Sequence, residues 1–143
     1  MNVVEQEGFR AVGLRIRTTS FSNEIPALWQ RFMPFMQSIT SSTPGISYGL
    51  MGEHHADGTF TYMAALAVDA DMVVDSSLDT WHVPAQRYAV FEANIHTLSE
   101  TFARIHGELI PAAGIHYGQG PSFEHYGPDF DTKQTLHIYI AIQ

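Results

Sequence analysis

The order of the hydrophobic patterns constrains this chain most, because a strand, a helix and two strands occur twice along it. In the first half, residues 9–19 alternate between apolar and polar side chains, which is typical of a half-buried strand. Residues 25–39 carry an apolar stripe at helical spacing and predict an amphipathic helix. Residues 46–53 and 59–70 indicate two strands, and Asp57-Gly58 between them is a strong hairpin signal.

The second half repeats this order of elements without repeating the sequence. Residues 86–95 indicate a strand, and residues 98–114 an amphipathic helix that ends at Gly114. Two further strands are expected at 122–126 and 134–142, on either side of a turn at Gly127-Pro128-Asp129. The intervening segment 71–80 is polar, and we expect a connection there rather than a strand.

These patterns predict an α+β fold in which duplicated β-α-β-β units form one antiparallel sheet with two main helices. A unit of about 70 residues cannot bury a sheet face well by itself, so the two units are expected to merge. With 143 residues, the chain is predicted to be a single domain over 1–143, with pseudo-repeats at about 1–70 and 85–143. A pseudo-two-fold axis between the units would leave a cleft between the two helices.

Charge and composition narrow the range of partners. Seven Lys and Arg residues against fifteen Asp and Glu residues give a formal charge of -8, which disfavours direct binding of nucleic acid. The sequence has no cysteine, no signal-peptide pattern and no apolar run long enough for a membrane span, so a cytoplasmic location is expected. His54 and His55 lack the spacing of a metal site, and no nucleotide-binding motif is present. We therefore expect no metal and no cofactor.

The two C-terminal strands contain the most suggestive polar residues. Side chains alternate between faces along a strand, so Glu124 and Tyr126 share one face of the first strand. On the second strand, His137 and Tyr139 share the face opposite the aliphatic residues. If the strands pair, Glu124, Tyr139 and His137 are predicted to converge over one patch of the sheet.

The sequence resembles the DNA gyrase inhibitor-like superfamily, which is also the effector-binding domain of AraC-type and multidrug-responsive transcription regulators. The resemblance rests on an ordered set of segments: 24–32 (EIPALWQRF), 48–50 (YGL), 84–91 (PAQRYAVF), 121–126 (PSFEHY) and 136–142 (LHIYIAI). It covers nearly the whole chain and implies the same duplicated fold. It also implies a cleft with aromatic walls and a buried carboxylate that binds small molecules, often lipophilic cations.

The resemblance places the family's carboxylate on Glu124 and the tyrosine of its last strand on Tyr139. This chain has His137 where the family often has a second glutamate, which would weaken the attraction for a cation. It also contains no helix-turn-helix segment. The candidate ligand-binding residues are Glu124, Tyr139, Trp29, His137, Tyr48, Tyr88 and Tyr62. No residue is assigned a catalytic role.

The leading hypothesis is a stand-alone domain that binds a lipophilic small molecule, cations included. Two alternatives remain open. One is a hydrolase of strained electrophilic compounds, in which Glu124 activates water. The other is a protein inhibitor directed at gyrase through its acidic surface. A DNA-binding regulator is a further candidate protein partner, and the sequence leaves open whether the chain is a monomer or a homodimer.

Overall fold

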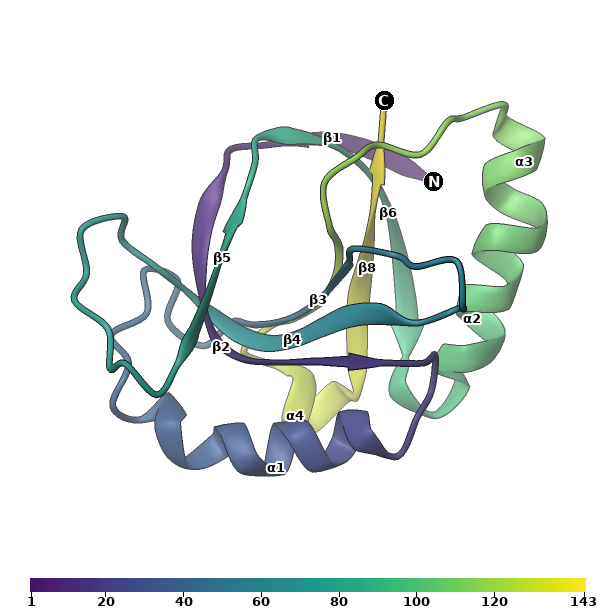
Figure 1. Cartoon of the computed structure of the whole chain (residues 1–143). Coiled ribbons are helices and arrows are strands. Elements are labelled where there is room, and N and C mark those ends of the chain that lie inside the picture. Colours follow the sequence, from purple (N-terminus) through teal and green to yellow (C-terminus); the bar gives the residue numbers. More distant parts are fainter.

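The computed structural model describes residues 1–143 and places all eight strands in one antiparallel sheet. The strand order is β1-β6-β8-β7-β3-β4-β2-β5 (Figure 1). The strands are β1 (Asn2–Gln6), β2 (Phe9–Thr18), β3 (Ser47–Gly52), β4 (Phe60–Val68), β5 (Asp79–Val83), β6 (Gln86–Asn94), β7 (Ser122–Tyr126) and β8 (Thr135–Ile142). The α-helices are α1 (Glu24–Met36), α2 (Leu98–Arg104), α3 (Ile110–Ala113) and α4 (Phe130–Lys133), with one π-helical stretch (Ile105–Leu109) between α2 and α3 and a short 3-10 turn (Ile95–Thr97) before α2. No helix combines the length and the apolar character needed to span a membrane.

The strand order confirms the predicted α+β class with a duplicated β-α-β-β arrangement. Going outward from the central β7–β3 pair, each unit contributes its strands in the same order: β7, β8 and β6 on one side, and β3, β4 and β2 on the other. The two units therefore meet at β7 and β3, whose antiparallel pairing places Glu124 beside Gly49.

The sheet closes on itself through two bent strands. β1 leads directly into β2, and β5 leads directly into β6. The β1–β6 and β2–β5 ladders keep one register across these bends, since Gln6 pairs with Gln86 and Phe9 with Val83. Closure of this kind leaves few unpaired edges and gives the sheet an inner and an outer face.

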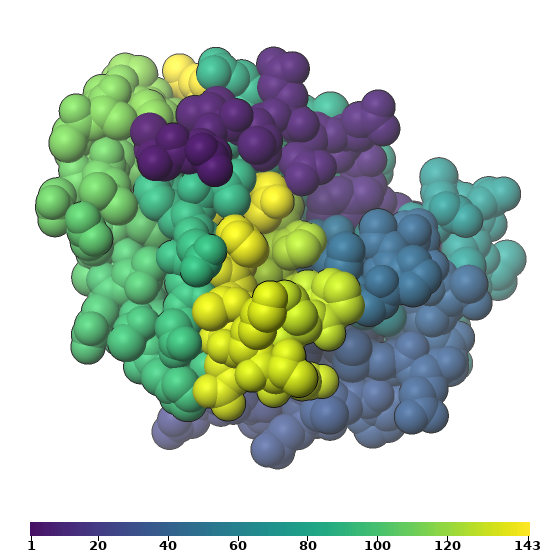
Figure 2. Space-filling view, turned by 180° about the vertical axis from the view of Figure 1, so that it is seen from behind, coloured from purple at the N-terminus to yellow at the C-terminus, as the bar shows by residue number.

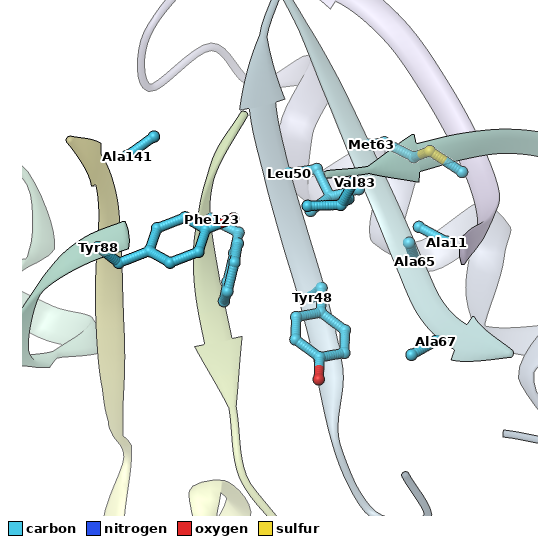
Figure 3. Close-up of a cluster of buried hydrophobic side chains, with 10 residues drawn as sticks. All are labelled: Ala11, Tyr48, Leu50, Met63, Ala65, Ala67, Val83, Tyr88, Phe123 and Ala141. Carbon is cyan, nitrogen blue, oxygen red and sulfur yellow. The ribbon is translucent and has the colours of Figure 1, made fainter. Parts of the chain in front are cut away.

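The inner face of the sheet holds the largest hydrophobic cluster. Its ten buried members are Ala11, Tyr48, Leu50, Met63, Ala65, Ala67, Val83, Tyr88, Phe123 and Ala141 (Figure 3). The labelled rings of Tyr48, Tyr88 and Phe123 come from three different strands and lie on the same side of the sheet. The outer face carries the helices, so β4 is buried along its whole length between the inner cluster and α1.

The two main helices cover different parts of the outer face (Figure 1). Leu28 and Phe32 of α1 pack on the outward residues of β4, among them Tyr62. On the other unit, Ile105 and Ile110 pack on the aliphatic face of β8 and β6, which includes Ile138 and Ile140. Each helix thus buries its apolar stripe against its own unit, as the helical spacing predicts.

Two strands lie where the sequence gave no strand signal. β1 is almost entirely exposed, and β5 falls partly within the segment predicted to be a polar connection. Only Val4 of β1 and Trp81 and Val83 of β5 pack on the inner cluster, and pairing with β6 and β2 orders both strands. Asp79 shows this, because its Oδ2 accepts a hydrogen bond from the backbone N–H of Arg15 at 3.0 Å. The local sequence therefore carried too little hydrophobic periodicity to reveal them.

The second helix is less regular than its sequence pattern predicts. It ends at Gly114, as expected, and this glycine has a left-handed φ of 67°. Between α2 and α3, however, the turn Ile105–Leu109 is π-helical. Pro111, two residues after this turn, has no N–H to donate, which accounts for the local change in hydrogen bonding.

Candidate functional site

A cavity of about 880 Å³ lies between α1 and α2, on the outer face of the sheet. This interhelical cavity confirms the predicted cleft. One wall is formed by residues of α1 and the loop before it, and the opposite wall by residues of α2. The floor consists of side chains from β3, β4 and β7. The cavity lining includes Trp29, Tyr62, Phe102, Glu124, Tyr126, Phe130 and Asp131.

Glu124 is buried at the floor of the interhelical cavity. Alternation along β7 points Phe123 to the inner cluster and Glu124 to the outer face, where only 6% of the residue is exposed. Its Oε1 accepts two hydrogen bonds, from the hydroxyl of Tyr62 at 2.6 Å and from that of Tyr126 at 3.0 Å. Oε2 makes no hydrogen bond and is not among the fully enclosed atoms that lack a partner, so it is the oxygen that reaches the cavity.

A chain of hydrogen bonds connects Glu124 to α1. The indole Nε1 of Trp29 donates to the hydroxyl oxygen of Tyr62 at 3.0 Å, and this hydroxyl in turn donates to Glu124. The ring of Trp29 also packs edge-on against that of Tyr126, with 5.6 Å between centroids. The indole N–H of a buried Trp needs an acceptor, and Tyr62 supplies it. Two consecutive hydrogen bonds therefore connect the indole of Trp29 to the carboxylate of Glu124.

Gly49 makes this close arrangement possible. It lies on β3, between β4 and β7, and pairs with Glu124. A Cβ atom at this position would overlap both the hydroxyl of Tyr62 and Oε1 of Glu124. The absence of a side chain lets the two polar groups meet above the strand.

Burial governs the titration of these groups. Desolvation raises the pKa of Glu124, and the hydrogen bonds from Tyr62 and Tyr126 offset part of this rise. Desolvation and the neighbouring carboxylate raise the pKa of Tyr62 and of Tyr126 well above the ordinary value of a tyrosine. Both phenols therefore remain protonated and act as donors. The lining contains no Lys or Arg, so no side chain with a permanent positive charge neutralises Glu124 inside the cavity.

The structure brings together only some of the residues that the sequence singled out. Glu124, Tyr62 and Trp29 meet at the floor and wall of the interhelical cavity. Tyr48, Tyr88 and Tyr139 belong to the inner face instead and do not line the cavity. Tyr139 stacks on Phe123, with 4.7 Å between centroids, and packs edge-on against Tyr88.

The predicted convergence of Glu124 with Tyr139 and His137 is wrong. In the β7–β8 ladder, Glu124 pairs with Ile138, while Phe123 pairs with Tyr139 and His125 with His137. Glu124 therefore shares its face with the aliphatic residues of β8, opposite Tyr139 and His137. His137 is exposed, and its Nε2 lies 4.0 Å from a carboxylate oxygen of Glu92.

Five aromatic residues of the cavity were absent from the candidate set: Phe21, Phe60, Phe102, Tyr126 and Phe130. Tyr126 donates directly to Glu124, and a signal for it existed, because the two share a face of β7. Phe102 lies on the wall formed by α2 and belongs to the apolar stripe predicted for that helix. Nothing in the stripe distinguishes a residue that lines a cavity from one that packs in a core.

Comparison with known proteins agrees with this architecture. The family model described as Cass2, integron-associated effector binding protein, matches residues 2–142. The chain belongs to this family. It is an effector-binding domain, and the matched residues include all four α-helices and all eight strands.

A curated relative is the transcriptional regulator BrlR of Pseudomonas aeruginosa, which is 30% identical over 147 residues. The match covers 98% of this chain and 54% of that regulator, so the chain spans about half the length of its relative. The family domain is therefore found within a larger regulator as well as in this chain.

Two solved structures share the fold at low sequence identity. The structure of SAV2435 bound to tetraphenylphosphonium has a TM-score of 0.77 at 20% identity, covering 99% of this chain and 93% of that one. The integron cassette protein Cass2 from Vibrio cholerae has a TM-score of 0.74 at 19% identity, covering 99% and 95%. These likenesses establish the fold alone.

Proposed function

We propose that the interhelical cavity binds lipophilic organic cations and that Glu124 provides the counter-charge. The observation that carries this proposal is a buried carboxylate, held by two tyrosine hydroxyls, in a lining with no Lys or Arg. Most of the other lining residues are apolar or aromatic, which suits a ligand that is hydrophobic apart from its charge.

The energetics favour a cation over a neutral ligand. Desolvating a carboxylate costs several kcal/mol, and the two tyrosines compensate for only part of this cost. A bound cation near Oε2 would supply the missing partner. Cation–π contact with the rings of Trp29 and Tyr126 would add about 0.5–2 kcal/mol each. A neutral molecule of the same shape would gain the apolar contacts but leave Glu124 without a counter-charge.

The relatives support the same class of ligand. SAV2435 is described in complex with tetraphenylphosphonium, a lipophilic cation. BrlR is a transcriptional regulator, which supports a sensing role for the domain. We propose that this chain contributes ligand recognition, that a DNA-binding regulator is its partner, and that the acidic chain makes no direct contact with DNA.

Fluorescence titration with tetraphenylphosphonium tests the proposal. The chain has two tryptophans: Trp29 lines the cavity, and Trp81 packs against the inner cluster. Ligand binding should quench the tryptophan fluorescence of the wild type and of the Trp81→Phe variant. The Trp29→Phe variant should show no such quenching. Triphenylphosphine oxide, which is neutral, is the control for shape and apolar contact.

The decisive variant is Glu124→Gln, which keeps the size of the side chain and removes its charge. We expect it to lose about tenfold or more of the affinity for tetraphenylphosphonium, because a buried counter-charge is removed. Its affinity for triphenylphosphine oxide should change little. Equal affinity of wild type and Glu124→Gln for the cation would refute the proposal.

The hydrolase alternative stays a prediction, and the same variant tests it. Turnover of a strained electrophilic compound by the wild type, absent in Glu124→Gln, would assign water activation to this carboxylate.

A further inference from the structure

The interhelical cavity has a second carboxylate, which the proposed function does not use. Asp131 lies on α4, lines the cavity and is exposed, whereas Glu124 is buried at the floor. The remaining titratable residues of the lining are His54, His106, Tyr62 and Tyr126, and none of them adds a permanent charge. The fixed charges of the cavity are therefore two negative ones at different depths.

Asp131 is free to accept a ligand. The cation nearest in sequence, Lys133, pairs instead with Asp129, with Nζ and Oδ2 3.2 Å apart. Asp131 itself makes no hydrogen bond and no salt bridge through its side chain. The segment that carries it lies at the surface in Figure 2, where the yellow α4 region separates the green helices of the second unit from the blue residues of the first.

A row of aromatic rings leads from Glu124 towards Asp131. Tyr126 donates its hydroxyl to Glu124, and its ring packs edge-on against Phe130, with 4.8 Å between centroids. The Tyr126 ring also packs edge-on against Trp29, with 5.6 Å between centroids. Phe130 directly precedes Asp131 in the chain and also lines the cavity. The two carboxylates are thus joined by a wall suited to a flat or ring-containing body.

We propose that the preferred ligand class of the cavity is elongated aromatic dications. One cationic group lies at Glu124, the aromatic body lies along the wall of Trp29, Tyr126 and Phe130, and the second cationic group lies at Asp131. The cavity volume of about 880 Å³ is near the upper end for small-molecule sites, about 300–1,000 Å³, and accommodates such a length. This inference rests on the proposed function, because it assumes that Glu124 holds the first cation.

Two series of probes test the inference. The dications are α,ω-bis(4-phenylpyridinium) alkanes with linkers of increasing length. The monocations are N-alkyl-4-phenylpyridinium ions with alkyl chains of the same lengths. The wild type should bind one dication of intermediate linker length more tightly than its monocation. If the affinity increased steadily with linker or chain length in both series, the effect would reflect hydrophobicity alone and would overturn the inference.

The variant Asp131→Asn separates the two carboxylates. We expect it to lose about fivefold in affinity for the best dication, the scale of a partly exposed ion pair, and to keep the affinity of the monocation. Asp129→Asn, two residues away and outside the cavity lining, is the matched control for the general effect of one negative charge. It should leave both affinities unchanged.

The outcomes distinguish the two proposals. Glu124→Gln should lower the affinity for both the dication and the monocation. An unchanged monocation affinity in that variant would refute the proposed function itself. If Glu124→Gln weakens the monocation but Asp131→Asn leaves the dication unchanged, the proposed function stands and the dication inference fails. Equal losses in Asp131→Asn and Asp129→Asn would also overturn the inference, because the effect would then be general electrostatic attraction.

Discussion

The hydroxyl of Tyr62 donates to Glu124 from a strand that is not its neighbour in the sheet. Tyr62 lies on β4 and Glu124 on β7, and β3 runs between them. The 2.6 Å hydrogen bond passes over Gly49, the residue of β3 that pairs with Glu124. One unit of the fold therefore provides the carboxylate, and the other provides its strongest donor. The charge at the cavity floor depends on both units being in place.

Replacing Gly49 with alanine is predicted to disrupt the Tyr62–Glu124 contact. The new methyl group would overlap both polar groups, so one of them must move. We expect a loss of about 1–3 kcal/mol in the free energy of unfolding, as for overpacked core sites, together with weaker binding of tetraphenylphosphonium. Chemical denaturation and fluorescence titration measure the two effects.

Gly107→Ala is the matched control, because an added Cβ there meets nothing within 4 Å. Replacing a glycine in a helical segment with alanine usually raises the free energy of unfolding by about 0.5–1 kcal/mol. If both variants behaved alike, the close approach over Gly49 would have no energetic consequence.

Removing the hydroxyl of Tyr62 is predicted to cost more stability than removing that of Tyr126. The Tyr62 hydroxyl accepts a hydrogen bond from Trp29 and donates one to Glu124, whereas the Tyr126 hydroxyl only donates to Glu124. Tyr62→Phe leaves the indole N–H of Trp29 without its acceptor and leaves Glu124 with Tyr126 as its one remaining donor. We therefore expect a loss of about 2–3 kcal/mol in the free energy of unfolding, against about 1 kcal/mol for Tyr126→Phe. Urea denaturation of both variants checks the order. The reverse order would show that the link to Trp29 contributes little.

The stability of the protein is predicted to depend on pH through Glu124. Desolvation raises the pKa of its carboxyl above the ordinary value of 4.5. The folded-state pKa of this carboxyl is higher than its unfolded-state pKa. The group therefore contributes its full stabilisation at pH values below the unfolded-state pKa, and this contribution is lost as the pH rises through the folded-state pKa. The wild type should therefore lose unfolding free energy relative to Glu124→Gln as the pH increases above 4.5. Denaturation curves of the pair from about pH 4 to pH 8 test this, because the other titrating groups are common to both. A difference that is constant with pH would contradict the prediction.

Ligand affinity should show the opposite trend with pH. The cation requires the ionised carboxylate, so binding of tetraphenylphosphonium should strengthen as the pH rises through the raised pKa of Glu124. Isothermal titration across the same pH range measures this. In Glu124→Gln the affinity should vary less over that range, because the contribution of Glu124 is removed while the other titratable groups of the lining are unchanged.

Tyr139→Phe is predicted to leave cation affinity unchanged to within about twofold, because Tyr139 lies on the inner face of the sheet, away from the interhelical cavity. Tyr126→Phe, the comparison variant, removes a hydroxyl that touches Glu124 and should lower the affinity. A large loss in Tyr139→Phe would mean that the inner face takes part in binding.

Local sequence patterns predicted six of the eight strands and the two main helices, in their order along the chain. Alternation in residues 9–19 and the apolar stripe in residues 25–39 depend on local periodicity, so β2 and α1 were predictable without any long-range information. β1 and β5 were not, because each has only one or two side chains on the core and both are ordered mainly by pairing with distant strands. Glu124 and Trp29 were predicted as candidate residues, but the hydrogen bonds that connect them through Tyr62 were not predicted.

Which face of the sheet each candidate occupies follows from long-range strand pairing. Alternation relates residues within β7 and within β8, but the register between the two strands is set by their connection and by the packing of both faces. A shift of one residue would have placed Glu124 beside Tyr139. Closure of the sheet buries aromatic residues on the inner face as well as on the outer one, so residue type gave no sign of the face. The cavity exists because α1 and α2, which are far apart in the sequence, each cover their own unit and leave the β3–β7 junction between them uncovered.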